Sequence, residues 1–312
     1  MGGESYPLEV SSDGARDPLG CELLDAGAGR RLERFGERVV DRPAPGATAA
    51  PRAPSAWRAA DLRFDPDRGW SGRADPGAPW SVVVEGLTLE LRATSSGGVG
   101  LYPEHAANLA WLDAEIRARL PGATGTPPAV LNLFAHTGLA TLAAARAGAA
   151  VAHVDAARAS VAWARRNAAL NGLEARPIRW LVDDAQALVD REARRGRRYQ
   201  GIVLDPPSSG RARTSRWTLA DDLPRLLAGC ARIVADDAFV LLTAHSTGLD
   251  GETLAALLDE ALPGLAGRRE VRRLELAAPS GATLPLGWAV RASAGRPVPP
   301  ARSSAGTGHH RG

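Results

Sequence analysis

Ala129-Val-Leu-Asn-Leu-Phe-Ala-His-Thr-Gly138 and Ile202-Val-Leu-Asp-Pro-Pro-Ser-Ser-Gly210 bound the stretch that decides the fold. Short apolar runs alternate with alanine-rich segments along this stretch. The apolar runs have the length of buried parallel strands and span 130–134, 151–154, 178–182 and 202–204. The alanine-rich segments have the length and propensity of helices and span 139–147, 158–170 and 185–195. This alternation predicts a doubly wound α/β sheet.

The residues that follow each apolar run are the candidates for ligand binding, because ligands of such sheets lie beyond the carboxyl ends of the strands. They are 132–138, Asp155, Asp183 with Asp184, and Asp205-Pro206-Pro207. Three of these four positions carry a carboxylate, which favours a nucleoside ligand with hydroxyl groups over a row of phosphates. The first turn contains a single glycine, where a dinucleotide enzyme would show G-x-G-x-x-G. A nicotinamide oxidoreductase is therefore disfavoured.

Four segments in this order resemble the class I S-adenosylmethionine-dependent methyltransferases, and specifically the bacterial group that includes ribosomal large-subunit RNA base methyltransferases. The matching segments are Val130-Leu-Asn-Leu-Phe-Ala-His-Thr-Gly138, Val154-Asp155-Ala156, Val182-Asp-Asp-Ala185 and Leu204-Asp-Pro-Pro207. Two flanking segments, Gly100-Leu-Tyr-Pro-Glu-His105 with Ala107-Asn108, and Gly281-Ala-Thr-Leu-Pro285, are similar to parts of one branch of that family. The resemblance covers roughly residues 20–292. It implies a Rossmann-like, seven-stranded, mostly parallel sheet that binds S-adenosyl-L-methionine.

The resemblance also implies which residues contact the cofactor. They are Asn132, Phe134, Thr137, Gly138, Asp155, Ala156, Asp183, Asp184 and Asp205. Gly138 is expected to open a helix and to let the backbone approach the ligand, while Asn132 and Thr137 offer hydrogen bonds to its methionine end.

The carboxylates after the second and third strands are expected to bind the adenosine end. Asp155 follows Gly138 by 17 residues, close to the ~20-residue offset at which an acidic side chain meets a ribose. A helix N-cap is the alternative role for Asp155. Asp184 is expected to contact the adenine amino group and Asp183 to cap the next helix, although the two can be exchanged.

Asp205-Pro206-Pro207 is the predicted catalytic tripeptide. Two prolines fix φ and remove two N–H groups, so the segment presents hydrogen-bond acceptors in a rigid arrangement. Such a surface suits a planar base with an amino group placed beside the methyl group. A strand that ends in a proline turn explains the prolines but not the aspartate.

The segment after this tripeptide is the predicted substrate contact. Arginines and an aromatic residue interleave there, a pattern that suits phosphate contact and base stacking, and a solvated charged loop is the alternative. The residues are Arg211, Arg213, Arg216 and Trp217.

A cysteine nucleophile, which carbon-5 methylation of cytosine requires, is not expected. The fourth motif continues Ser208-Ser209, the next strand end reads Thr243-Ala-His-Ser246, and Cys230 lies in an apolar helical pattern. Nitrogen or oxygen methylation is therefore favoured. His245 is a candidate base or orienting group, with a satisfied core histidine as the alternative, and His136 is interpreted as a turn residue.

The composition is that of a soluble globular protein. The 312 residues are 45% hydrophobic and 23% charged, and all 38 cationic residues are arginine, with a net charge of +3. That balance permits an RNA partner without requiring one.

Cys21 and Cys230 form neither a disulfide framework nor a metal site by spacing, and the histidines are scattered, so we expect no metal and a cytoplasmic protein. The apolar runs are shorter than the ~18 residues of a membrane span.

Four regions are predicted: a polar leader (1–18), a β-rich N-terminal region (19–120), the cofactor-binding domain (121–292) and a disordered tail (293–312). The N-terminal region is expected to contain two small strands near 21–24 and 38–40, an extended segment over 41–80, a hairpin over 80–91 and a helix over 103–119.

Methylation of a ribosomal RNA base is the leading hypothesis. Methylation of a small molecule or protein, and an inactive nucleoside- or RNA-binding module, remain alternatives, and the oligomeric state is left open.

Overall fold

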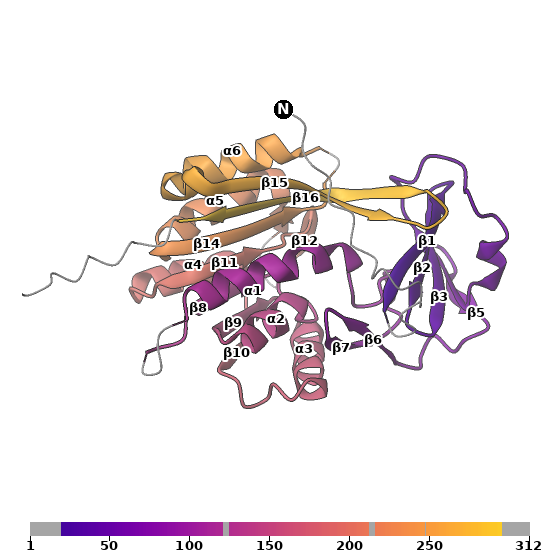
Figure 1. The fold of residues 1–312 in the computed structure, drawn as a ribbon, viewed down its shortest axis with the longest axis horizontal. Coiled ribbons are helices and arrows are strands. Elements are labelled where there is room, and N and C mark those ends of the chain that lie inside the picture. Colours follow the sequence, from indigo (N-terminus) through magenta and orange to yellow (C-terminus); the bar gives the residue numbers. More distant parts are fainter. Residues whose placement is uncertain (1–19, 121–124, 212–215, 247, 295–312) are drawn as a thin grey trace, which may run out of the picture.

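The structure is a computed structural model that describes residues 20–120, 125–211, 216–246 and 248–294. Its centre is a seven-stranded sheet (Figure 1). In spatial order the strands are β10 (Ile178–Val182), β9 (Ala150–Asp155), β8 (Ala129–Leu133), β11 (Tyr199–Leu204), β14 (Val234–Ala244), β16 (Thr283–Ser293) and β15 (Arg269–Ala277). The first five are parallel, and β16 is antiparallel to both of its neighbours. This topology confirms the predicted doubly wound sheet.

Helices cover both faces of the sheet. Helices α1 (Leu109–Ala118), α2 (Leu139–Ala147) and α3 (Arg158–Leu170) pack on one face, and α4 (Ala185–Arg194), α5 (Leu219–Ala231) and α6 (Gly251–Ala261) on the other (Figure 1). A short 3-10 helix, η3 (Pro263–Arg268), leads from α6 into the last hairpin. Each face has its own buried core because successive strand residues point to opposite sides, as Val130 and Leu131 do.

Gly138 begins α2 in a left-handed conformation with φ of 97°. A Cβ at this position would lie 2.9 Å from Leu142 Cδ1 and 3.0 Å from Ala164 Cβ. Both the backbone conformation and the space therefore require glycine. The expectation that Gly138 opens a helix is confirmed.

The N-terminal region forms a second sheet beside the first. Its strands are β1 (Cys21–Gly27), β2 (Arg30–Phe35), β3 (Arg38–Pro43), β4 (Leu62–Asp65) and β5 (Gly69–Gly72), paired in that order, with a 3-10 helix η1 (Ala56–Ala59) between β3 and β4. The hairpin β6 (Trp80–Val84) and β7 (Leu87–Leu91) follows, and the 3-10 helix η2 (Pro103–Asn108) leads into α1.

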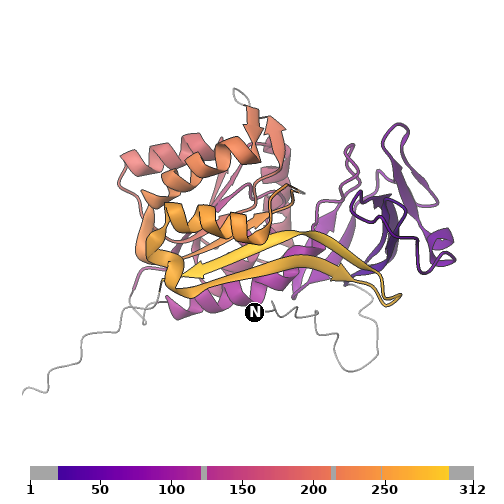
Figure 2. The ribbon, with the colours of Figure 1, turned by 90° about the horizontal axis from the view of Figure 1, so that it is seen from above.

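The long β15–β16 hairpin joins the two sheets. It extends beyond the central sheet and reaches the N-terminal sheet in both views (Figures 1 and 2). Leu276 and Leu284 of the hairpin pack in one buried cluster with Leu23 and Ala26 of β1. The β15–β16 hairpin thus packs directly against the N-terminal sheet.

Four predictions for the N-terminal region and the later loop meet different outcomes. The 80–91 hairpin is confirmed. The extended segment over 41–80 is wrong in part, because this stretch supplies η1, β4 and β5 to a five-stranded sheet. The 103–119 helix is divided into η2 and α1, with Pro103 at the start of the tighter turn. The 210–217 loop contains the short paired strands β12 (Ser209–Arg211) and β13 (Arg216–Thr218).

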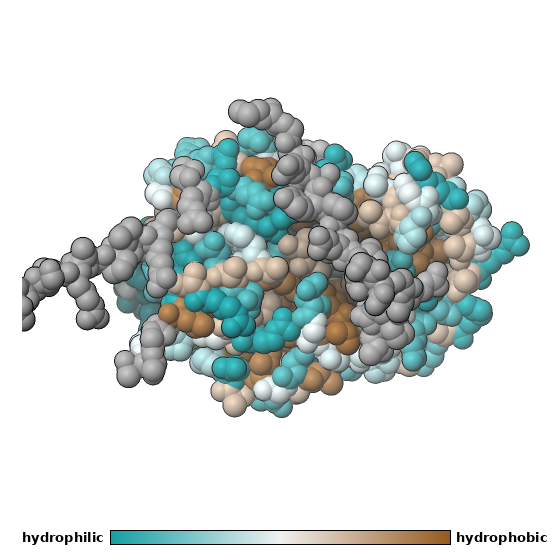
Figure 3. Space-filling model, in the orientation of Figure 1, coloured by the Kyte–Doolittle hydropathy of each residue, from teal (hydrophilic) through white to brown (hydrophobic). Residues whose placement is uncertain are grey.

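One face of the surface mixes hydrophilic residues with smaller hydrophobic patches (Figure 3). Among the described residues, Tyr102 is a large hydrophobic side chain that stays 41% exposed, and it lies beside the cleft described below. No helix in the described part of the chain is long and apolar enough to cross a membrane.

Candidate active site

A cleft opens at the carboxyl ends of β8, β11 and β14, where a doubly wound sheet binds its ligand. Its empty volume is about 580 Å³, including the open mouth. The segment before α1 forms one wall, the loop after β8 another, and the ends of β11 and β14 the floor. The lining of the cleft includes Gly100, Tyr102, His105, Asn132, Phe134, His136, Thr137, Gly138, Asp205 and Thr243.

The loop after β8 is held in an unusual backbone conformation. Phe134 and His136 have φ of 56° and 48°, a left-handed region that costs non-glycine residues of order 1 kcal/mol or more. Two hydrogen bonds hold the loop: His136 N donates to Asp155 Oδ2 at 2.8 Å, and Thr137 Oγ1 donates to Gly100 O at 2.6 Å. The turn role predicted for His136 is confirmed, and burial keeps the pKa of its ring below the usual value.

Asn132 and Thr137 line the cleft, but their donors already have protein partners. Asn132 Nδ2 donates to Thr141 Oγ1 at 2.9 Å, and Thr141 Oγ1 lies 2.9 Å from His153 Nδ1. Burial lowers the pKa of His153 to about 3, so this ring is neutral. The Thr137 hydroxyl is bonded to Gly100. These bonds fix the loop to its surroundings and leave the second N–H of Asn132 and the acceptor lone pairs of the Thr137 hydroxyl for a ligand, so the predicted contact with the methionine end stays a prediction.

The predicted adenosine-binding carboxylates lie at the ends of two adjacent strands, outside the lining of the cleft. Asp155 ends β9, and its Oδ1 and Oδ2 accept hydrogen bonds from the backbone nitrogens of Ala157 and His136, each at 2.8 Å. Asp183 N donates to Asp155 O, so the ends of β9 and β10 meet. Ala156, next to Asp155, is exposed.

Asp184, and not Asp183, caps the helix that follows β10. Asp184 caps α4, with its Oδ1 accepting from Ala187 N at 2.9 Å. Asp183 accepts a bond from Asp184 N at 2.9 Å and pairs with Arg191. The prediction that Asp183 caps the helix is wrong, because the residue directly before the first helical position has the extended conformation that a cap needs.

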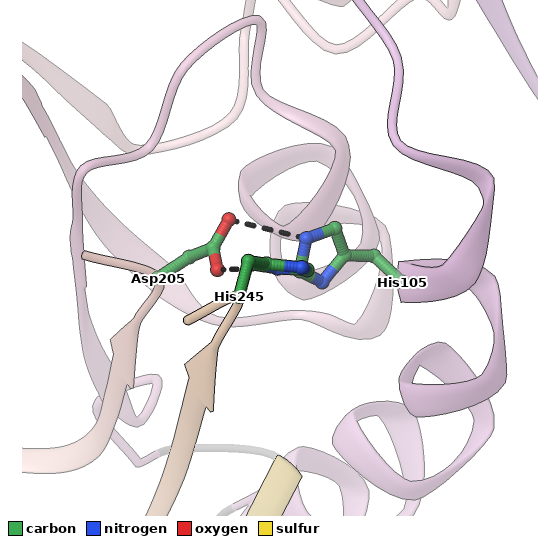
Figure 4. Close-up of side chains that lie close together, drawn as sticks. All are labelled: His105, Asp205 and His245. Carbon is green, nitrogen blue, oxygen red and sulfur yellow. Dashed lines mark hydrogen bonds and ion pairs between the residues drawn. The ribbon is translucent and has the colours of Figure 1, made fainter. Parts of the chain in front are cut away.

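Asp205 lies at the centre of a cluster that three separate segments build (Figure 4). Thr243 Oγ1 donates to Asp205 Oδ1 at 2.5 Å, and His245 Nε2 lies 3.2 Å from the same oxygen. His105 Nε2, from η2, lies 3.1 Å from Asp205 Oδ2 without the alignment of a hydrogen bond. On the far side of His245, Nδ1 bonds to Leu286 O at 2.8 Å.

The two imidazoles decide the charge of this cluster. Burial raises the pKa of Asp205, but the charges of His105 and His245, together with the hydrogen bond from His245, outweigh burial and hold it well below the ordinary value. Burial lowers the pKa of His245, but its hydrogen bond to Asp205 and that carboxylate's charge raise it to about 9. The charge of Asp205 also raises the pKa of His105 against the effect of burial. Asp205 is therefore ionised at neutral pH.

The proline pair continues from Asp205 and is covered by Trp217. Trp217 Nε1 donates to Pro207 O at 2.7 Å, and the indole packs against the Phe134 ring at a centroid distance of 5.1 Å. One of the predicted acceptor carbonyls is thus already bonded. Arg211 and Arg216 occupy the paired strands β12 and β13, and Arg213 lies outside the described residues.

Glu104 and His105 are the site residues that sequence reasoning did not assign. Glu104 is 3% exposed, its Oε1 lies 3.7 Å from His245 Nδ1, and its Oε2 has no hydrogen-bond partner. The sequence feature that could have identified them is the segment Gly100-Leu-Tyr-Pro-Glu-His105, which resembles a segment of the family. Because His105 stands 100 residues before Asp205, the sequence does not indicate that the two side chains meet.

The cleft lining contains no cysteine. Cys230 is fully buried in α5, where burial raises the pKa of its thiol to about 12. Such a thiol does not ionise at neutral pH and cannot act as a nucleophile. The core role predicted for Cys230 is confirmed.

Comparisons with known proteins identify similar chains, although no family model matches. A solved S-adenosylmethionine-dependent methyltransferase from Agrobacterium tumefaciens is 34% identical, with a TM-score of 0.81 over 88% of this chain and 90% of that chain. Ribosomal RNA large subunit methyltransferase K/L of Magnetococcus marinus is 28% identical over 53% of this chain and 22% of its own length. Ribosomal RNA large subunit methyltransferase I of Shewanella denitrificans is 27% identical over 64% and 47%. This chain therefore spans about a fifth to a half of the length of these two curated relatives.

Proposed function

The chain belongs to the S-adenosylmethionine-dependent methyltransferases, and from that premise we propose that it methylates a nitrogen of an RNA base, with ribosomal RNA as the substrate. The observation that carries the proposal is the ionised Asp205 at the floor of the cleft, directly before two prolines and beside an aromatic pair. A carboxylate and a carbonyl accept hydrogen bonds from an amino group, and Phe134 with Trp217 offers aromatic surface to a flat ring.

S-adenosylmethionine supplies a methyl group on a positively charged sulfur, so the protein needs to position the acceptor rather than form a covalent intermediate. Asp205 accepts a hydrogen bond from the amino group of the base and orients the nitrogen lone pair toward that methyl. Pro206 and Pro207 hold the carboxylate at a fixed place and angle. The nitrogen gains the carbon as the sulfur–carbon bond breaks, and it then loses a proton to water.

The residues at the ends of β8, β9 and β10 fit the cofactor. We assign the ribose hydroxyls to Asp155, the adenine amino group to Asp184 or Asp183, and the methionine end to the backbone of the loop that Gly138 closes. The adjacency of Asp155 and Asp183 at the edge of the sheet supports this arrangement. Asp155 also holds His136 N, so ligand binding and loop conformation are connected through one carboxylate.

RNA as the substrate rests on the two curated relatives, whose names specify ribosomal RNA. The decisive experiment incubates the full chain with labelled S-adenosylmethionine and ribosomal RNA from a strain that lacks the gene. Label should enter one nucleotide, which mass spectrometry then identifies as N-methylated. Label in a protein or a small metabolite, with none in RNA, would show that the substrate class is wrong.

We expect Asp155→Asn to weaken binding of S-adenosylhomocysteine by about tenfold, because a hydrogen bond to a charged acceptor contributes about 1.5–3 kcal/mol. Asparagine retains an acceptor oxygen for only one of the two backbone nitrogens that Asp155 holds, so thermal melting accompanies the titration to show that the variant is folded. Isothermal titration measures the affinity. The matched control is Asp190→Asn. It alters a carboxylate on α4 that pairs with Arg232, and this variant should bind S-adenosylhomocysteine normally. If Asp155→Asn binds S-adenosylhomocysteine as tightly as the parent chain, Asp155 does not contact the cofactor.

A further inference from the structure

Three side chains from distant parts of the sequence meet with metal-ligating atoms toward one another (Figure 4). His105, Asp205 and His245 each offer one such atom, and all three atoms lie within 4.8 Å of one another. Metal–nitrogen and metal–oxygen bonds are about 2.0–2.2 Å long, so neighbouring ligands of one ion lie roughly 3.0–3.5 Å apart. Each imidazole has one carboxylate oxygen of Asp205 within this interval: Oδ2 lies 3.1 Å from His105 Nε2, and Oδ1 lies 3.2 Å from His245 Nε2. The carboxylate would therefore present a different oxygen to each side of the ion.

The orientation of the rings also suits a metal ion. His245 Nδ1 bonds to Leu286 O, which leaves Nε2 directed to the centre of the cluster, as in metal-binding histidines whose other nitrogen bonds to a carbonyl. His105 Nε2 is buried, is close to Asp205 and lacks an aligned hydrogen bond. An ion pair of protonated His105 with Asp205 is the alternative partner of this nitrogen, and a metal ion would bind there in place of the proton.

The surroundings add support behind the three ligands. Thr243 Oγ1 donates to Asp205 and fixes its carboxylate. Glu104 is buried 3.7 Å behind His245, with one oxygen unpartnered, and adds negative charge next to that ring. Hydrogen bonds and charges around the ligands are what tune the affinity of metal sites.

We propose that His105, Asp205 and His245 bind a divalent transition-metal ion, with Zn²⁺ as the expected occupant. Two imidazoles with one carboxylate suit zinc, iron, cobalt or nickel, while magnesium and calcium prefer oxygen ligands alone. The ion retains open positions toward the cleft. One consequence rests on the proposed function: a bound ion occupies Asp205, so it competes with the acceptor base and suppresses methyl transfer.

Titration of the full chain with Co²⁺ tests the site, in a background in which His309 and His310 are alanine so that the terminal pair adds no ligands. After treatment with a chelator, one cobalt ion per chain should bind with visible absorption and be displaced by Zn²⁺. His105→Ala and His245→Ala should each weaken binding by about 100-fold or more, the upper end of what loss of a supporting residue costs. Glu104→Gln should weaken it by about tenfold.

His136→Asn is the matched control, because it removes a histidine that lines the same cleft and asparagine tolerates the left-handed backbone there. This variant should bind cobalt normally. Where an alanine variant melts early, His105→Gln or His245→Gln replaces it. Unchanged cobalt affinity in the folded variants, or no binding by the parent chain, would overturn the proposal.

Methyl transfer provides the second readout. Zn²⁺ should inhibit the parent chain and a chelator should restore its rate, and an unchanged rate in zinc-loaded protein would reject competition at Asp205. The cobalt titration needs neither methyl donor nor RNA. If the chain transfers no methyl group to RNA, the cobalt titration still tests the metal site. If the chain binds no cobalt, the methyl-transfer assay still tests the proposed function.

Discussion

Replacement of Asp205 with asparagine will slow methyl transfer by about 100-fold while the fold is retained. The substitution preserves the size of the side chain and one acceptor oxygen for Thr243 Oγ1, but it removes the charge that orients the amino group of the base. A hydrogen bond to a charged group is worth about 1.5–3 kcal/mol, and each 1.36 kcal/mol changes a rate tenfold. Single-turnover transfer of labelled methyl to saturating RNA measures the effect on the chemical step.

Two controls separate a catalytic loss from a structural one. Thr243→Val removes the hydroxyl that holds Asp205 but leaves the carboxylate charged, so its rate should fall less than that of Asp205→Asn. Thermal melting should show that both variants are folded. A single-turnover rate of Asp205→Asn equal to that of the parent would mean that Asp205 does not touch the acceptor.

The sequence predicts the central domain well because its signals are local. The runs at 130–134 and 151–154 contain buried strands, and Gly138 stands where the backbone must turn left-handed. The run at 178–182 is also a strand, but it lies at the edge of the sheet and its residues stay partly exposed, so the expectation that it is buried is wrong. Parallel strands then bring the residues after them to one edge, so Asp155 and Asp205 could be assigned to that edge by position alone.

The contacts made by the site residues could not be predicted in the same way. Thr137 and Asn132 look like ligand donors in a linear motif, but tertiary packing places a carbonyl and a hydroxyl against them. Likewise, His105 and His245 stand 100 and 40 residues from Asp205, and their convergence depends on how η2 packs over the ends of β11 and β14. Spacing rules for metal ligands detect neighbours in sequence and miss such a cluster.

The β-rich character of the N-terminal region is confirmed, but its strands β4 and β5 were missed for a related reason. Prolines and glycines interrupt residues 41–80, and these two strands have four residues each, too few for a clear alternating pattern. Their pairing depends on β3, which lies about 20 residues earlier and is itself rich in charge. Arg42 of β3 is buried together with Glu33 of the neighbouring strand β2, and buried charges of this kind hide a core strand from sequence analysis.

The buried Glu33–Arg42 pair leads to the second large expected effect, a loss of about 3 kcal/mol in the free energy of unfolding for Glu33→Gln at pH 7. Arg42 binds both carboxylate oxygens, at 2.5 Å and 3.1 Å, and Arg31 Nε lies 3.4 Å away. Removal of the acid takes away the carboxylate that pairs with these two buried guanidinium groups and leaves Glu104 as a nearby negative charge. Urea-induced unfolding measures the loss, and Asp113→Asn, in an exposed pair with Arg117, is the control that should change stability little.

The dependence of this loss on pH follows from the pKa of Glu33. Burial raises that pKa, but the charges of Arg42 and Arg31 outweigh burial and lower it below the ordinary value. A carboxyl with a depressed pKa in the folded state contributes stability that is fully present above its unfolded pKa of about 4.3 and is lost as the pH falls through its folded pKa. The gap in stability between the parent and Glu33→Gln should therefore be constant from pH 7 to about pH 5 and narrow below about 4.3. A gap that stays constant into that acidic range would show that packing, rather than the charge of Glu33, causes the loss of stability.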